Sequence, residues 1–242
     1  KIETTLLTPE QAKMAATPKT IRTKVTEQQL KLMPIGSFTM GSPRREPGRR
    51  ANEAQRDVQL KRPFYMGVNE VTNGQYRKFK SGHRSGLVGQ HTLDLDNQPV
   101  VGITWQEAAQ FCNWLSQQEG LPAAYENKGG RLVPVQPMTT GYRLPTDAEW
   151  EWVARYQGGG KFRRYAWGDA LPVAKASGNY ADLTARLIVQ DVIPEYEDGF
   201  AAAAPVGKFP PNPLGLYDVG GNVAEWVHDH YTVSADSSEV AV

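Results

Sequence analysis

Two segments in the last third of the chain combine hard oxygen donors with glycine. Asn179 and residues 198–200 form one set, and residues 218–225 place two carboxylates around a pair of glycines. Carboxylate, amide and carbonyl oxygens suit calcium, and glycine lets backbone carbonyls turn toward an ion. The residues therefore predict calcium binding at one or both segments. An alternative stays open, in which Asp198 and Asp218 accept hydrogen bonds from turn amides and hold the loops without an ion.

Other residues with reactive side chains form weaker patterns. Cys112 is the only cysteine, so an internal disulfide or a two-thiol redox or metal site lacks its second thiol. It lies in an apolar helical stripe without a cationic neighbour in sequence, which favours a small core residue over a reactive thiol. His228 and His230 flank Asp229, and a single histidine pair favours a surface or supporting role over a metal site.

The composition limits the partners and the compartment. Lys and Arg number 27 and Asp and Glu 26, so the net charge of +1 gives no global electrostatic reason to expect nucleic acid or an anionic membrane. No apolar run reaches the roughly 18 residues that span a bilayer, so no transmembrane segment is expected. The 23 glycines and 17 prolines favour a loop-rich fold. The chain starts at Lys1, and if a signal peptide preceded it, the compartment is periplasmic or extracellular.

Capping boxes mark the starts of four short helices that would position these segments. In each box a threonine and a Glu or Gln three residues later bond two amides at the helix start. The pairs are Thr8 with Gln11, Thr72 with Gln75, Thr104 with Glu107, and Thr146 with Glu149. The expected helices span residues 9–16, 73–80, 105–118 and 147–155.

Short strands are expected between these helices, at residues 38–40, 58–60, 64–66 and at Val68. Residues 1–30 are more polar than the rest and are interpreted as an N-terminal extension. One domain is expected over residues 31–242.

Four motifs in a fixed order carry a resemblance to a known family. They are Pro-Ile-Gly-Ser-Phe-Thr-Met-Gly-Ser at residues 34–42, Glu-Val-Thr-Asn at 70–73, Tyr-Arg-Leu-Pro-Thr-Asp-Ala-Glu-Trp at 142–150, and Gly-Leu-Tyr-Asp-Val-Gly-Gly-Asn-Val-Ala-Glu-Trp at 215–226. From about residue 31 to residue 231 the chain resembles the formylglycine-generating enzymes and their relatives, the sulfatase-modifying-factor family. The resemblance implies an α+β fold of the C-type-lectin-like kind, rich in loops, with short strands and a few short helices.

The resemblance also implies two structural calcium ions. The first site would use the side chains of Asn179 and Asp198 and the carbonyls of Tyr180 and Phe200. The second would use the carboxylates of Asp218 and Glu225 and the carbonyls of Gly221 and Val223. Asp218 stands where an amide is also common in the family, and its extra carboxylate is expected to tighten binding. An insertion over residues 183–196 separates the halves of the first site.

The sequence departs from the family's oxidases where their chemistry resides. The resemblance implies that those enzymes bind copper(I) through a cysteine pair in their C-terminal third, since soft copper(I) requires soft thiolates. The present sequence reaches Val242 without that pair, and Cys112 lies on a core helix far from the matching motif. Copper is therefore not expected. Two explanations stay open: the natural protein ends here, or a part that bears the cysteines lies outside the sequence.

These features lead to one preferred function and two alternatives. The family includes members without the cysteines that act as accessory proteins of the bacterial envelope, and the chain looks most like the periplasmic regulators of threonine phosphorylation in type VI secretion. We expect a non-catalytic, calcium-binding regulatory protein that binds a partner protein, such as the periplasmic part of a membrane Ser/Thr kinase.

The first alternative is an oxidase or maturation enzyme, for formylglycine generation or siderophore maturation, whose active-site segment lies outside the sequence. The second is a lectin-like glycan binder, which follows only from analogy of fold.

Overall fold

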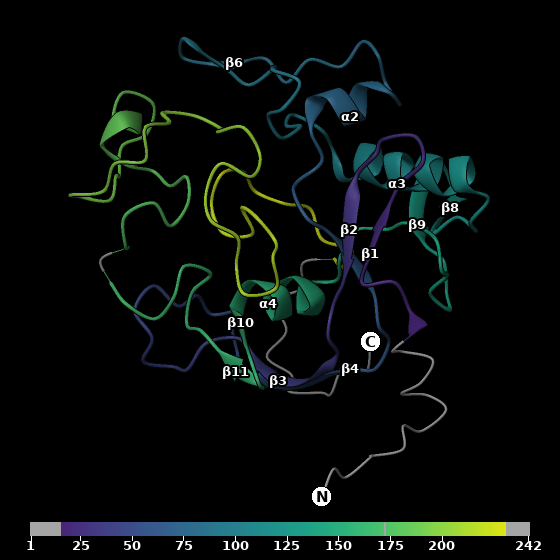
Figure 1. The fold of residues 1–242 in the computed structure, drawn as a ribbon, viewed down its shortest axis with the longest axis horizontal. Helices are drawn as coiled ribbons and strands as arrows, with labels where there is room; N and C mark the ends of the chain where they lie inside the picture. The colour runs from purple at the N-terminus through teal and green to yellow at the C-terminus, as the bar shows by residue number, and fades with distance from the viewer. Residues whose placement is uncertain (1–15, 172, 231–242) are drawn as a thin grey trace, which may run out of the picture.

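The domain is built of short antiparallel strand pairs and short helices joined by long loops (Figure 1). The computed structural model describes residues 16–171 and 173–230. Its elements in chain order are β1 (Thr20–Arg22), β2 (Gln29–Leu32), β3 (Gly36–Met40), β4 (Arg56–Leu60), β5 (Tyr65–Gly67), α2 (Asn73–Arg77), β6 (Leu87–Val88), β7 (His91–Thr92), α3 (Trp105–Glu119), β8 (Tyr125–Lys128), β9 (Arg131–Pro134), α4 (Asp147–Arg155), β10 (Tyr156–Gly158), β11 (Lys161–Phe162) and the 3-10 turn η1 (Leu183–Ala185). This mixture agrees with the predicted α+β class. Within these residues, every helix is too short or too polar to cross a membrane.

The largest sheet has three antiparallel strands, in the order β1-β2-β5. Leu30 of β2 pairs with Gly67 of β5, and the Val68 N–H just beyond β5 still donates to the Gln29 carbonyl at 2.9 Å. β5 pairs with β2 alone and is therefore an edge strand of this sheet. The strand β1 and the first two residues of β2 lie within residues 1–30, the segment predicted to be an N-terminal extension.

Three of the predicted helices lie within the described residues, and each begins with the predicted capping box. The threonine hydroxyls of Thr72, Thr104 and Thr146 accept from the amides of Gln75, Glu107 and Glu149, whose side chains accept from the threonine amides in return. α2 ends at Arg77 instead of residue 80, because the next residues form a tight turn in which two amides share the Tyr76 carbonyl. The first predicted helix, at residues 9–16, lies outside the described residues except for its last position.

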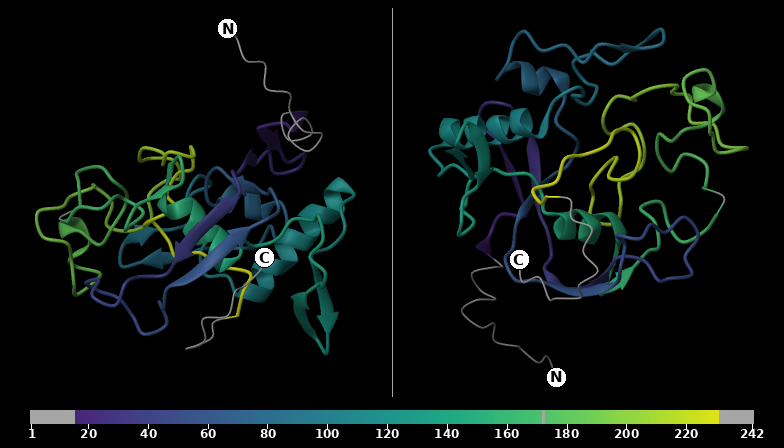
Figure 2. Two further views of the ribbon diagram at one scale, coloured as in Figure 1. Left: turned by 90° about the horizontal axis from the view of Figure 1, so that it is seen from below. Right: turned by 180° about the vertical axis from the view of Figure 1, so that it is seen from behind.

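Three clusters of buried side chains hold the described elements together, and two of them include the contacts of α4 and α2. In the first, α4 packs on the β3–β4 pair, with the Trp152 ring edge-on to Phe38 at a centroid distance of 5.4 Å. Gly36 allows this approach, since a Cβ there would lie 2.9 Å from the Trp152 ring. In the second, Tyr76 of α2 packs on Phe111 of α3. Figures 1 and 2 place the long loops after β11 on the side opposite α3 and the β8–β9 pair.

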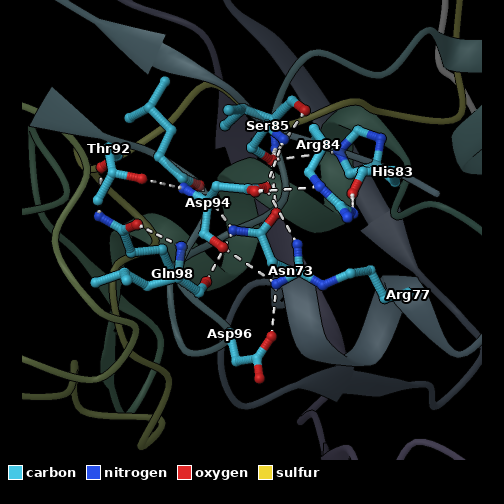
Figure 3. A network of polar contacts seen from close by, with 12 residues as sticks. Asn73, Arg77, His83, Arg84, Ser85, Thr92, Asp94, Asp96 and Gln98 are labelled. Atoms are coloured by element: carbon cyan, nitrogen blue, oxygen red, sulfur yellow. Dashed lines mark hydrogen bonds and ion pairs between the residues drawn. The ribbon is translucent and has the colours of Figure 1, made fainter. Parts of the chain in front are cut away.

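A polar network fixes residues 83–98, including the β6–β7 pair, on the start of α2 (Figure 3). The Asn73 amide is fully buried at its centre. Its Nδ2 donates to the carbonyls of Leu93 and Leu95 at 2.7 and 3.0 Å, and its Oδ1 accepts from Ser85 Oγ at 2.6 Å. One asparagine therefore determines the path of a long loop that has little regular structure.

Replacing Asn73 by alanine is expected to lower the free energy of unfolding by about 2 kcal/mol, because three polar groups lose a buried partner at once. Chemical denaturation measures the change. Asn127→Ala is the matched control, since Asn127 accepts one bond, from the Gly130 N–H, in the exposed β8–β9 turn. The free energy of unfolding of Asn127→Ala is expected to stay within about 0.5 kcal/mol of the wild-type value. Equal losses in the two variants would contradict the central role of Asn73.

Candidate metal sites

The structure brings together all four residues predicted for the first site. Asp198 Oδ2 accepts from the Tyr180 N–H at 2.9 Å, and Oδ1 accepts from the Phe200 N–H at 2.8 Å. The carboxylate thus lies between the two residues whose carbonyls are expected as ligands. Asn179, which precedes Tyr180, is buried.

The Asn179 amide has a defined orientation. Its Nδ2 donates to the Ala202 carbonyl at 2.7 Å and to Asn222 Oδ1 at 3.0 Å. Both donor positions are therefore used, and Oδ1 is left as the acceptor oxygen. A side-chain amide oxygen is one of the ligands that calcium accepts.

The insertion at residues 183–196 does not keep the halves of the first site apart, because hydrogen bonds close its base. The Leu183 N–H donates to the Tyr196 carbonyl at 3.4 Å, and the Ile193 N–H donates to the Ala181 carbonyl at 2.7 Å. Tyr196 also donates its hydroxyl to the Gly178 carbonyl at 2.6 Å. The insertion therefore forms a closed loop beside the site.

Asp182 supports this site and is not among the residues predicted from the sequence. It is fully buried and accepts from the Asp198 N–H at 2.6 Å, as well as from Thr184 and the Ala185 N–H at the start of η1. Burial opposes ionisation, yet the bonds from Thr184, Asp198 and Ala185 hold the pKa of Asp182 below its usual value. Asp182 is the N-cap residue of η1. Aspartate is a preferred N-cap residue, and this preference is the sequence signal that could have identified Asp182.

In the second predicted site, Asp218 is buried with one oxygen unpaired. Its Oδ2 accepts from the Gly207 N–H at 2.6 Å, while its Oδ1 has no hydrogen-bond partner among the described residues. Burial raises the pKa of this carboxyl. Asp218 has φ +54°, a left-handed conformation that Asn and Asp tolerate better than most residues.

Glu225, Gly221 and Val223 follow in the same loop. Glu225 is exposed, and its Oε2 accepts from Trp150 Nε1 on α4 at 2.7 Å. No N–H within the described parts of the chain donates to the Gly221 or Val223 carbonyl. The two predicted carbonyl ligands are thus available to an ion.

Glu70 and Asn69 join the second site from a distant part of the chain. Glu70 Oε2 and Asn69 Oδ1 are both buried without a partner in the described structure. Burial, and then the negative charges of Asp218 and Glu225, raise the pKa of Glu70 to about 9. Glu70 opens the Glu-Val-Thr-Asn motif at residues 70–73, but nothing local in the sequence indicates its place beside Asp218.

These oxygens fit a hard cation. Buried polar atoms in folded proteins almost always have a partner, so three unpaired oxygens beside carboxylates of raised pKa indicate an uncompensated negative site. Across residues 16–171 and 173–230, no three His, Cys, Asp or Glu side chains are close enough to hold a metal by themselves. A calcium ion here would therefore depend on the amide and carbonyl oxygens as well as the carboxylates.

Cys112 is unsuited to thiolate chemistry. Burial raises the pKa of its thiol to about 12, so the nucleophilic and metal-binding form is scarce near neutral pH. The residue lines a cavity of about 950 Å³ that is bordered by β5 and α3 and whose wall also includes Glu70, Glu225 and Trp226.

The histidine pair has a structural role. His228 is buried, and its Nδ1 shares a hydrogen bond of 3.0 Å with the Tyr125 hydroxyl. Burial and the nearby Arg143 lower the pKa of His228. His230 stacks on the Trp105 ring.

The chain is similar to a family of known proteins over nearly its whole length. The model of the Sulfatase-modifying factor enzyme 1-like domain matches residues 15–242. The mouse protein named formylglycine-generating enzyme is 31% identical over 224 residues, which make up 83% of this chain and 58% of that protein. The mouse protein named inactive C-alpha-formylglycine-generating enzyme 2 is 28% identical over 236 residues, which make up 86% of this chain and 71% of that protein.

A solved structure is similar over most of the fold. PvdO from Pseudomonas aeruginosa superimposes with a TM-score of 0.65 and 26% identity, over 93% of this chain and 81% of that chain. The chain spans less than two thirds of the length of the mouse formylglycine-generating enzyme.

Proposed function

The chain belongs to the Sulfatase-modifying factor enzyme 1-like family, and we propose that it is a non-catalytic, calcium-binding member that binds a partner protein in the bacterial envelope. The observation that carries the proposal is the second site, where Asp218, Glu70 and Asn69 each have a buried oxygen without a partner. A cation there would neutralise the carboxylates and fill the unpaired acceptor positions.

Calcium would have a structural role at both sites. Asn179 and Asp198 would hold one ion together with the Tyr180 and Phe200 carbonyls. Asp218 and Glu225 would hold the other with the Gly221 and Val223 carbonyls. Loops that lack regular structure would then be fixed by metal ligands. The second ion would also be linked to α4, because its ligand Glu225 accepts from Trp150.

The only thiol among the 242 residues is unsuited to oxidase chemistry. Cys112 is held on α3 with a pKa of about 12, so copper(I) would not find a thiolate pair among these residues. One relative of this chain is named inactive C-alpha-formylglycine-generating enzyme 2, and this name supports the proposal of a non-catalytic member.

A polypeptide partner is supported by the cavity beside the edge strand β5. A strand edge and an apolar wall together suit an extended segment that adds a strand and inserts its side chains. Phe64, Met66 and Phe111 form part of that wall. The fold is proposed to be of the C-type-lectin-like kind and the compartment periplasmic. The partner is proposed to be the periplasmic part of a membrane kinase that controls type VI secretion.

Isothermal titration with calcium chloride tests the metal sites. The metal-free chain is expected to bind two calcium ions. Asp198→Asn is expected to remove the first ion, and Asp218→Asn is expected to weaken binding of the second, because an amide at position 218 keeps the ligand oxygen and loses the charge. Magnesium is expected to bind more weakly, because it demands near-octahedral geometry that a carbonyl-rich loop does not offer.

Two results would contradict the proposal. The absence of calcium binding by the chain would remove the metal sites. Oxidation of a cysteine-containing peptide by the purified chain, measured by mass spectrometry, would remove the non-catalytic role.

A further inference from the structure

Asn222 contacts both candidate sites with one side chain. It lies between Gly221 and Val223, the two carbonyl residues of the second site. Its Oδ1 accepts from Asn179 Nδ2 at 3.0 Å, and its backbone N–H donates to the Asn179 carbonyl at 2.8 Å. On the other side its Nδ2 donates to Glu70 Oε1 at 3.1 Å. A ligand of the first site and a carboxylate beside the second are therefore joined through one amide.

The Asn222 amide has only one orientation that satisfies these bonds. Its Oδ1 also accepts from the Ala204 N–H at 2.8 Å, and its Nδ2 also donates to the Ala204 carbonyl at 3.3 Å. Its φ of +56° is a left-handed conformation. Turning the amide over would place donor against donor at both Asn179 and Ala204.

The two ligand segments are also in direct contact on either side of this amide. A Cβ on Gly221 would lie 2.5 Å from the Asn179 carbonyl oxygen, and a Cβ on Gly178 would lie 3.1 Å from the Gly220 carbonyl oxygen. Residues 178–180 and 220–222 therefore leave little room for one segment to move without the other.

We propose that Asn222 couples the two candidate calcium sites, so that an ion at either site raises the affinity of the other. The inference rests on the proposed calcium binding. An ion that fixes Asn179 also fixes Asn222 and, with it, the Gly221 and Val223 carbonyls. The second ion then binds a loop that is already ordered, so its binding costs less conformational entropy. Linkage makes the effect equal in both directions.

The coupling is measured by calcium titrations of single-site proteins. The affinity of the second site is determined in Asp198→Asn and compared with its affinity in the intact chain. We expect a loss of at least about five-fold when the first site is disabled, the lower end of typical coupling between sites. The same comparison in an Asn222→Gly background is expected to show no loss, because glycine keeps the left-handed backbone and removes only the amide.

Asn113→Ala is the matched control. Asn113 makes three hydrogen bonds through its amide, to Ala124 and Tyr125, but lies on α3 and contacts neither site. It is expected to lower the stability and leave the coupling unchanged. If Asn222→Gly does not fold, Asn222→Asp replaces it, since aspartate retains the acceptor oxygen and loses the donor to Glu70.

The outcomes separate this inference from the proposed function. Two ions that bind with the same affinities whether or not the other site is intact would overturn the coupling and leave calcium binding in place. If the two sites remain coupled in the variant without the Asn222 amide, the coupling does not depend on Asn222, and this part of the inference is wrong. A chain that binds no calcium would overturn the proposed function itself.

Discussion

Millimolar calcium is expected to raise the Tm of the chain by about 10 °C, and excess EGTA to reverse the change. Ligands that bind only the native state stabilise it by about 4 kcal/mol when their concentration is a thousand times Kd. For a chain of this size each kcal/mol corresponds to about 2 to 4 °C. Differential scanning calorimetry with calcium and with EGTA measures the shift.

The contribution of the second site to this shift is isolated by Asp218→Asn. Asparagine tolerates the left-handed backbone at this position, so the variant removes charge with little added strain. We expect the calcium-dependent rise to become smaller, because an amide oxygen binds calcium more weakly than a carboxylate. The rise should be complete in Asp57→Asn, since Asp57 is an exposed residue of β4 that bonds the Thr39 hydroxyl. A wild-type Tm that is the same with calcium and EGTA would exclude structural calcium.

The calcium-free chain is expected to lose about 3 kcal/mol of its free energy of unfolding between pH 5.5 and pH 8, because of Glu70. Its pKa is about 9 in the folded state and about 4.5 when the chain is unfolded. The folded state thus favours the protonated acid. This contribution is fully present below pH 4.5 and disappears as the pH rises toward 9.

Glu70→Gln is expected to flatten this dependence, since glutamine stays neutral and its Oε1 can still accept from Asn222. Denaturant titrations at several pH values, in EGTA, give the slope. His228 does not interact with Glu70, so its contribution is the same in both proteins and cancels in their difference. Asp218 and Glu225 repel the Glu70 carboxylate, so the difference includes the effect of Glu70 on these two groups. The slope should persist in Glu126→Gln, because Glu126 is exposed and paired with Lys128. An identical slope in all three proteins would show that Glu70 is ionised in the folded state.

The parts of the fold that follow local rules could be predicted from the sequence. The capping boxes at Thr72, Thr104 and Thr146 located three helix starts correctly, because a capping box is completed within four residues. The strands β6 and β7 were missed because two residues cannot display an alternating pattern. The end of α2 was missed because it depends on a turn and not on a Gly or Pro signal.

In the candidate site, too, the residues that are close in sequence could be predicted and those brought together by the tertiary fold could not. Residues on one loop, such as Asp218 and Glu225, could be identified together as possible ligands. Glu70 and Asn222 could not, because their hydrogen bond joins positions 152 residues apart. The raised pKa of Glu70 also depends on burial, which only the packed domain creates. Calcium binding itself stays a prediction.

The long separation between Glu70 and Asn222 has a consequence for the order of folding. The oxygens of Glu70 and of residues 218–225 at the second site are far apart in the sequence, and the hydrogen bond between Glu70 and Asn222 spans 152 residues. Trp150, which donates to Glu225, is 75 residues away from it in the sequence. Such distant segments meet only after most of the chain has closed on itself, since each closure is opposed by chain entropy. A partly folded chain would therefore have no complete site. The ion would bind only after the domain has folded, so it would stabilise the native state and would not direct the order of folding.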